Sequence, residues 1–232
     1  MNSRMLLFDP MYFILILPAL LLASWAQSKV KGAFAKNSNI RSSRNVSGAE
    51  VARNLLDRAG LREVAVEPLN TGGLGDHYDP RHRTIRLSPD VYGGTSLAAL
   101  GVAAHEAGHA LQHAGGYFWL GIRNAIIPVS QFGSRLAFPL FFVGLLFQGE
   151  MLMTIGIAFF ALAVGFQLIT LPVEYNASSR AIGLLESEGF VTSSEIPAVR
   201  EVLDAAALTY LAAALMAVMQ LIYLLTLRGR RR

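Results

Sequence analysis

Four long apolar stretches interrupt the more polar parts of this 232-residue chain. They are residues Met11–Ala26, Ala125–Phe147, Met151–Val173 and Ala205–Leu227. A helix needs about 20 mostly apolar residues to cross the hydrocarbon core of a bilayer. The first stretch can be extended back to Met5, and the other three have this length as they stand. Only Gln148, Gly149 and Glu150 separate the two middle stretches, with a turn at Gly149-Glu150. The two stretches therefore predict a transmembrane hairpin.

The first apolar stretch could be a cleaved signal peptide or an uncleaved anchor. The segment Ala23-Ser24-Trp25-Ala26 is a poor cleavage site, and Lys29 and Lys31 follow it as the flank of a membrane anchor would. We therefore interpret residues 1–28 as an N-terminal transmembrane anchor.

The region from residue 29 to residue 120 has shorter patterns. Ser47-Gly48-Ala49-Glu50 is a capping box before an apolar stripe, which predicts a short amphipathic helix that ends at Gly60. A glycine-rich turn (Gly72, Gly73, Gly75) leads to Asp76–Asp79 and Thr84–Leu87, which predict two short strands around a turn.

A helix rich in alanine and leucine is predicted over Leu97–Leu111, with Thr95 or Ser96 as its cap. Beyond the hairpin, Glu174 begins a segment that predicts a polar helix ending at Gly189. The last helix is expected to begin near Ser193 or Ser194, with Pro197 in its first turn.

Composition supports a membrane protein, because 53% of the residues are hydrophobic and only 16% are charged. A soluble domain usually carries about 25% charged residues. The chain has no cysteine, so a metal would have to be held by histidine and carboxylate side chains. The net charge is +4, and Arg228, Arg230, Arg231 and Arg232 cluster at the end. This cluster is typical of a membrane flank, and we expect no nucleic-acid partner.

The predicted helix 97–111 carries the motif His105-Glu106-Ala107-Gly108-His109. Histidines four residues apart lie on one helix face, where both rings can reach a single metal ion. A glutamate directly after the first histidine is the general base in the HExxH motif of zinc metalloproteases. The pattern predicts His105 and His109 as zinc ligands and Glu106 as the catalytic base.

A catalytic zinc ion usually has a third protein ligand and an open position for water. His113 follows His109 on the same helix, where three successive turns cannot easily surround one ion. The extended motif HExxHxxGxxH is absent, since Gln112 and Gly115 stand at its glycine and histidine positions.

Glu174 is the better candidate for the third ligand. A closed hairpin returns the chain to the membrane face that it left, and so brings Glu174 back beside the HExxH helix. Taken alone, Glu174 could equally be an interfacial glutamate that caps a helix N-terminus.

A family resemblance extends over nearly the whole chain. The motif HExxH, the hairpin and Glu174-Tyr175-Asn176-Ala177-Ser178 together resemble the HtpX-type and CAAX prenyl membrane proteases, which have aspartate where this chain has Ser178. The resemblance to YugP-type membrane zinc metallopeptidases of prokaryotes is closer, and serine is usual at that position there. The matching runs are Asp76–Ser88, Asp90–Tyr92, Ala98–Ala110, Glu174–Ser178 and Val202–Tyr210.

This resemblance implies a zinc-dependent membrane endopeptidase of the HExxH, gluzincin-like kind, with one zinc ion per chain. We expect a mainly α membrane protein, with about four transmembrane helices and a small α+β zincin-like catalytic region that carries the HExxH helix. The predicted parts are the anchor 1–28, the catalytic region 29–120, the hairpin 121–173, the polar helical segment 174–203 with the third ligand, and the C-terminal helix with its basic tail 204–232.

Further roles follow as hypotheses. Ser178 is expected to hydrogen-bond a metal-binding histidine. A donor that stabilises the transition state could come from one of four residues, among which the sequence does not choose: His77, Tyr78, Arg180 and Tyr210. The strand pair 76–87 could bind an extended substrate at its edge, in which case proline at Ile85 should reduce turnover more than zinc content.

Two sets of basic residues favour opposite orientations of the chain in the membrane. Lysines and arginines after the anchor favour a cytoplasmic catalytic face, whereas the terminal arginines favour a cytoplasmic C-terminus. We expect a cytoplasmic catalytic face because the resembled HtpX-type proteases work there. The expected partners are a peptide or protein substrate, membrane proteins included, and the lipid bilayer, and a regulatory membrane partner stays open. The alternatives are a catalytically silent zinc-binding scaffold or partner-regulating protein and, more weakly, a transporter.

Overall fold

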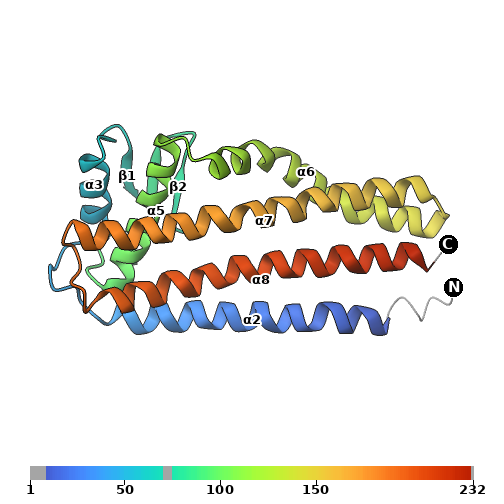
Figure 1. The fold of residues 1–232 in the computed structure, drawn as a ribbon, viewed down its shortest axis with the longest axis horizontal. Coiled ribbons are helices and arrows are strands. Elements are labelled where there is room, and N and C mark those ends of the chain that lie inside the picture. Colours follow the sequence, from blue (N-terminus) through green and yellow to red (C-terminus); the bar gives the residue numbers. More distant parts are fainter. Residues whose placement is uncertain (1–8, 70–74, 231–232) are drawn as a thin grey trace. The chain divides into compact units, whose positions relative to one another are not determined.

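The computed structural model describes residues 9–69 and 75–230. Within them the chain is mainly helical with one small sheet, as the sequence predicts (Figure 1). Gly72 and Gly73 of the predicted turn, and Arg231 and Arg232 of the basic tail, lie outside the described residues.

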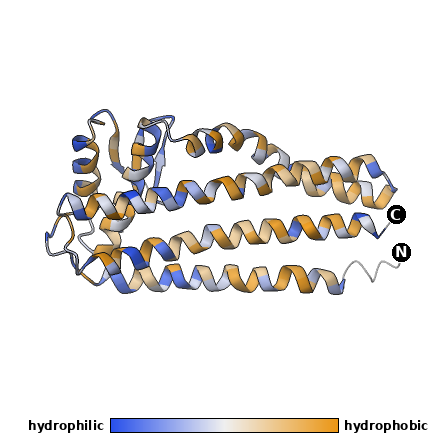
Figure 2. Cartoon of the chain, in the orientation of Figure 1, coloured by the Kyte–Doolittle hydropathy of each residue, from blue (hydrophilic) through white to orange (hydrophobic). Residues whose placement is uncertain are grey.

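Four helices in the described part of the chain are long and apolar enough to cross a membrane (Figure 2). They are α2 (Pro10–Ser38), α6 (Phe118–Phe147), α7 (Glu150–Ser187) and α8 (Ile196–Gly229). The predicted fold class, a mainly α membrane protein with a small sheet-containing region, is confirmed.

The chain forms two compact units, and each is described by itself. Among the described residues, the membrane unit comprises 9–27, 122–171 and 209–230. The metal-centre unit comprises the described residues 28–69, 75–121 and 172–208.

The core of the membrane unit includes Phe141, Leu145 and Leu224, which are almost fully buried. Helices α6 and α7 approach closely at Gly156, where a Cβ atom would lie 2.7 Å from the carbonyl oxygen of Ala137. Small residues allow such close helix packing in membranes. The connection between the two helices is short, and Gln148 has a left-handed φ of 59° there. Helices α6 and α7 therefore form a helical hairpin.

Helix α7 differs from the prediction, because no new helix begins at Glu174. The helix runs without a break from Glu150 to Ser187 and includes Pro172. Proline removes one helical hydrogen bond, which a long packed helix tolerates. The change from apolar to polar residues at Glu174 thus marks a change of surroundings rather than a change of secondary structure.

The metal-centre unit contains α3 (Gly48–Arg58), α4 (Pro89–Tyr92) and α5 (Leu97–Ala114). Helix α3 begins at the predicted capping box: the Ser47 hydroxyl accepts from the Glu50 N–H at 3.2 Å, and the Glu50 carboxylate accepts from the Ser47 N–H at 2.7 Å. Ser96 caps α5 by accepting from the N–H of Ala99 at 3.2 Å. These bonds satisfy amide groups that the first helical turn leaves open.

The sheet has three strands in the order β1-β3-β2, one more than the sequence predicted. Strand β1 (Ala65–Pro68) pairs in parallel with β3 (Thr84–Leu87), and β2 (His77–Asp79) pairs with β3 in antiparallel fashion. Ile85 therefore lies in the central strand, where its side chain is fully buried. Proline at Ile85 would disrupt the whole sheet, so it cannot serve as the specific test of an edge strand that the sequence suggested.

Candidate metal centre

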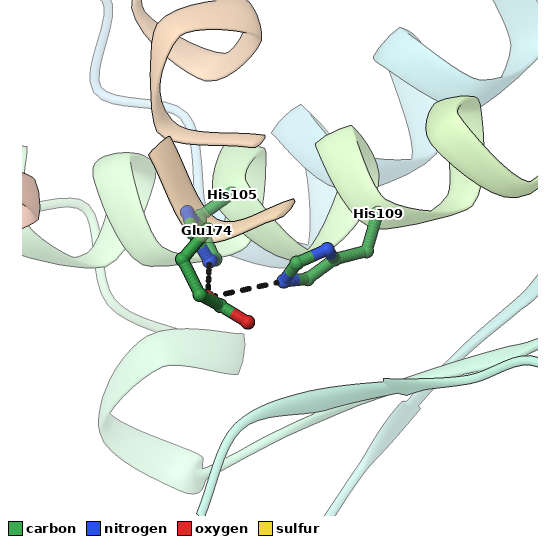
Figure 3. A group of neighbouring side chains, drawn as sticks. All are labelled: His105, His109 and Glu174. Atoms are coloured by element: carbon green, nitrogen blue, oxygen red, sulfur yellow. Dashed lines mark hydrogen bonds and ion pairs between the residues drawn. The ribbon is translucent and has the colours of Figure 1, made fainter. Parts of the chain in front are cut away.

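His105, His109 and Glu174 meet within the metal-centre unit (Figure 3). The Nε2 atoms of His105 and His109 lie 3.2 Å and 3.5 Å from Oε2 of Glu174. The possible ligand atoms of the three residues all lie within 4.8 Å of one another. The side chains of His105, His109 and Glu174 have exposed fractions of 13%, 10% and 2%, so each is at least 87% buried. The predicted trio is thus assembled as one enclosed group.

The close approach of α5 and α7 brings these residues together. Gly108 stands between the ligand candidates on α5, and a Cβ atom there would lie 2.9 Å from the carbonyl oxygen of Ala177. Glycine at this position lets α5 lie directly against the backbone of α7. The fourth position of the HExxH motif is therefore a packing position, which the spacing of the histidines alone does not indicate.

Gln112 contacts the Nδ1 side of the His109 ring, opposite the nitrogen that faces Glu174. Its side-chain Nε2 donates to the carbonyl oxygen of Val173 at 2.8 Å and to Oδ1 of Asn176 at 2.9 Å. Its Oε1 must then face His109, whose Nδ1 lies 3.0 Å away. An amide oxygen only accepts hydrogen bonds, so Nδ1 carries the proton and Nε2 keeps the lone pair that a metal needs.

Ser178 acts in a similar position on the other histidine. Its hydroxyl oxygen lies 3.1 Å from Nδ1 of His105 and can accept a hydrogen bond from the Nδ1–H group. Both imidazoles therefore present Nε2 toward Glu174. This arrangement fits a divalent ion such as zinc, which binds imidazole nitrogen and carboxylate oxygen.

Glu106 is buried, with 7% of its surface exposed, and it is not one of the three grouped ligand candidates. Its Oε2 accepts a hydrogen bond from the backbone N–H of Tyr78 at 2.8 Å. Tyr78 lies on the edge strand β2, so this outward-facing N–H is used by Glu106. The bond ties the carboxylate of Glu106, a residue of α5, to strand β2.

The electrostatic balance of the centre follows from its two buried carboxylates. Burial by itself would lower the pKa of His109, but the nearby carboxylates of Glu174 and Glu106 outweigh burial and raise the pKa. Burial raises the pKa of the Tyr78 phenol, so this side chain is neutral at physiological pH.

The four predicted donor candidates have different surroundings. The Tyr78 hydroxyl lies 2.8 Å from Nδ1 of His113. Nδ1 of His77 lies 2.8 Å from the carbonyl oxygen of Gly75. Arg180 is exposed and donates through Nε to Oδ1 of Asn176 at 2.8 Å. Tyr210 belongs to the membrane unit.

Sequence reasoning missed the structural position of Gln112 and Asn176. In the sequence, Gln112 is notable only as the residue that breaks the longer histidine motif. Its position three residues after His109, on the same helix face, was the available signal. The partners of its amide group lie on α7, more than 60 residues away in the chain.

The fold and the site define the class: a membrane protein with four long apolar helices and a group of two histidines and one glutamate that could hold a metal ion. The chain belongs to the family described as "Putative neutral zinc metallopeptidase", which matches residues 12–229. It is 49% identical over 223 residues to the "Putative membrane protease YugP" of Bacillus subtilis (strain 168). The matched region covers 95% of this chain and 98% of that protein. No solved structure matches the chain.

Proposed function

We propose that this chain is a membrane-embedded zinc endopeptidase, in which His105, His109 and Glu174 bind one zinc ion and Glu106 is the general base. The observation that carries the proposal is the enclosed trio, with both imidazoles oriented through Nδ1 so that Nε2 faces Glu174. Three protein ligands leave a position open for water, which is the pattern of catalytic rather than structural zinc sites.

When bound, zinc lowers the pKa of water toward about 7 and polarises the carbonyl group of a peptide. Glu106 takes the proton of the attacking water and later delivers it to the leaving amine. The Tyr78 N–H holds Oε2 of Glu106 at 2.8 Å, and we assign Oε1 to the proton. Gln112 and Ser178 keep the histidine rings in the tautomer that binds metal.

The donor that stabilises the transition state is proposed from the predicted set His77, Tyr78, Arg180 and Tyr210. Tyr78 is favoured among them because its own backbone contacts the base Glu106. In the free protein its hydroxyl is held by His113, and it would have to turn toward the substrate.

The test is zinc content and proteolysis of the purified, detergent-solubilised protein, with casein and a membrane-protein substrate. Glu106→Gln should retain about one zinc ion per chain and lose at least about 100-fold in turnover, because a general base contributes about 10²–10⁴-fold. Glu186→Gln is the matched control, since Glu186 is an exposed glutamate of the same unit; it should behave as wild type.

The outcomes separate the alternatives. Zinc in both proteins with no cleavage by either would favour the silent scaffold, or a need for a regulatory membrane partner. A wild-type protein without zinc would show that the ligand assignment is wrong. Equal activity of Glu106→Gln and wild type would remove Glu106 as the base.

We also propose that the metal-centre unit lies on the cytoplasmic side. The lysines and arginines that follow the anchor support this orientation. The chain has no cysteine, so a single Glu186→Cys variant reports the location of this unit. A membrane-impermeant maleimide should label Cys at this position only after the cells are opened, and labelling of intact cells would reverse the orientation.

A further inference from the structure

The membrane unit contains a cavity of about 530 Å³ between segments of α2, α6, α7 and α8. Four glutamines line it, one from each helix: Gln27, Gln131, Gln167 and Gln220. Hydroxyl side chains of two serines and a threonine add to the polar lining, and aromatic, methionine and alanine side chains form the rest. Its volume is in the range of about 300–1,000 Å³ that is typical of ligand sites.

The lining is polar and uncharged. Among the described residues that line this cavity, none is an aspartate, glutamate, lysine, arginine or histidine. A lipid phosphate or a metal ion would need an opposite charge, which the lining does not supply. A lipid acyl chain would gain nothing from glutamine side chains, whose polar groups are costly to keep in an apolar environment.

Glutamine offers an amide donor and an amide acceptor together, as a peptide group does. Within a bilayer, an unwound polypeptide must find partners for every backbone N–H and C=O that its own helix no longer satisfies. Four glutamines around one cavity match this requirement, and the apolar part of the lining suits uncharged side chains.

We propose that this cavity binds an extended, uncharged stretch of a membrane-spanning substrate. The proposal rests on the proposed peptidase function and names the substrate class: membrane proteins whose spanning segment is unwound in the enzyme. The glutamines substitute for the helical hydrogen bonds that this segment loses.

The first test is photo-cross-linking in the full-length Glu106→Gln protein, which does not depend on turnover. A benzophenone amino acid is placed at Ala213, which lines the cavity, or at Leu211, which is exposed on the same helix outside the lining. The probe is a single-span protein with an uncharged spanning segment, reconstituted with the enzyme in lipid nanodiscs. We expect substrate adducts from position 213 and not from position 211.

Two outcomes overturn the proposal. Lipid adducts alone at position 213 would show that the cavity holds an acyl chain. Equal substrate adducts from both positions would show contact with the outer surface only. Neither outcome depends on whether the wild-type protein cleaves peptides, so a failure here is separate from a failure of the peptidase function.

The second test uses the wild-type catalytic residues and a triple variant, Gln131→Met, Gln167→Met and Gln220→Met, which keeps side-chain size but removes hydrogen bonds. Cleavage of the single-span substrate should fall about tenfold more than cleavage of casein, as expected for the loss of one or two net hydrogen bonds. Zinc content reports that the variant is folded. Thr154→Val is the matched control, because Thr154 is exposed and bonds only within its own helix, to the carbonyl oxygen of Glu150 at 2.7 Å. Equal losses for both substrates would overturn the proposal.

Discussion

The two units use buried polar groups in opposite ways. In the metal-centre unit, charged and polar side chains have defined partners: Gln112 bonds His109, Val173 and Asn176, and Ser178 bonds His105. In the membrane unit, a set of uncharged polar side chains surrounds a cavity.

The difference follows from the cost of charge away from water. Buried carboxylates are tolerated when they are paired or bind a metal, and Glu174 lies against two imidazoles. A cavity among spanning helices has no such compensation in its lining, and neutral amides suit it better. Fixed partners favour a preorganised metal centre, whereas open amide groups favour a ligand that brings its own donors and acceptors.

The largest expected effect is at the metal. Glu174→Gln keeps the shape of the side chain but removes its charge. Zinc affinity should fall by more than about 100-fold, because loss of a group that only orients a ligand already lowers metal affinity by up to about 100-fold. Activity should be lost with the zinc. The measurement is zinc content at buffered free zinc, with Glu186→Gln, on the same helix, as the control. Retained zinc would show that Glu174 is a structural partner of the histidines rather than a ligand.

The next effect tests whether the defined partners matter. Gln112→Met keeps the volume but removes the acceptor for His109 and the donor to Val173. We expect zinc affinity to fall about 10–100-fold and the free energy of unfolding to fall by about 1–3 kcal/mol. Asn54→Ala, which removes an exposed amide bonded to its own helix, should leave zinc affinity unchanged. If stability falls but zinc affinity does not, Gln112 only joins α5 to α7.

A third experiment adds one methyl group to each unit by replacing a closely packed glycine with alanine. Gly108→Ala meets the Ala177 carbonyl oxygen, and Gly156→Ala meets that of Ala137. Each should cost about 1–3 kcal/mol of stability because the packed helices must move apart. Zinc affinity should fall for Gly108→Ala and stay unchanged for Gly156→Ala. Gly183→Ala, where nothing lies within 4 Å, should be neutral or stabilising in thermal unfolding.

The smallest expected effect is on the stability of strand β2, whose Tyr78 N–H donates to Glu106. Burial raises the pKa of Asp79, but hydrogen bonds from His82, Arg86 and the backbone outweigh it and hold this pKa below its usual value. Because its pKa is lowered by folding, ionised Asp79 stabilises the fold at every pH above about 4, the ordinary pKa of aspartate. This stabilisation is lost as the pH falls from there through the lower pKa of the folded state.

Asp79→Asn should therefore cost less than about 1 kcal/mol at neutral pH, since its ion pairs are partly exposed. Denaturant unfolding of both proteins between pH 7 and pH 3 measures this difference. It should stay constant down to about pH 4 and narrow below it. A difference that grows on acidification would contradict the assignment.

Much of the architecture could be predicted from local patterns. The four apolar helices follow from the length of the apolar stretches, and the start of α3 follows from Ser47 and Glu50. The pairing of β1 with β3 could not be predicted, because parallel strands are joined through a long connection and their register is set by tertiary packing.

The sequence by itself predicted which side-chain types could bind a metal in this protein. The spacing of His105 and His109 places two imidazoles on one helix face whatever surrounds that helix. The absence of cysteine restricted the remaining ligands to histidine and carboxylate. Membership of the YugP-type family, predicted from the matching runs, is confirmed. The roles of His105, Glu106, His109 and Glu174 remain predictions until zinc and activity are measured.

Only the tertiary structure decided which groups hold that chemistry in place. Gln112, Asn176 and the Tyr78 N–H gain their positions from contacts between segments far apart in the chain, and the cavity in the membrane unit is formed by four separate helices. Helical periodicity acts over a few residues and can be predicted from sequence. Contacts between elements depend on how whole surfaces pack against one another, and no local pattern encodes that packing.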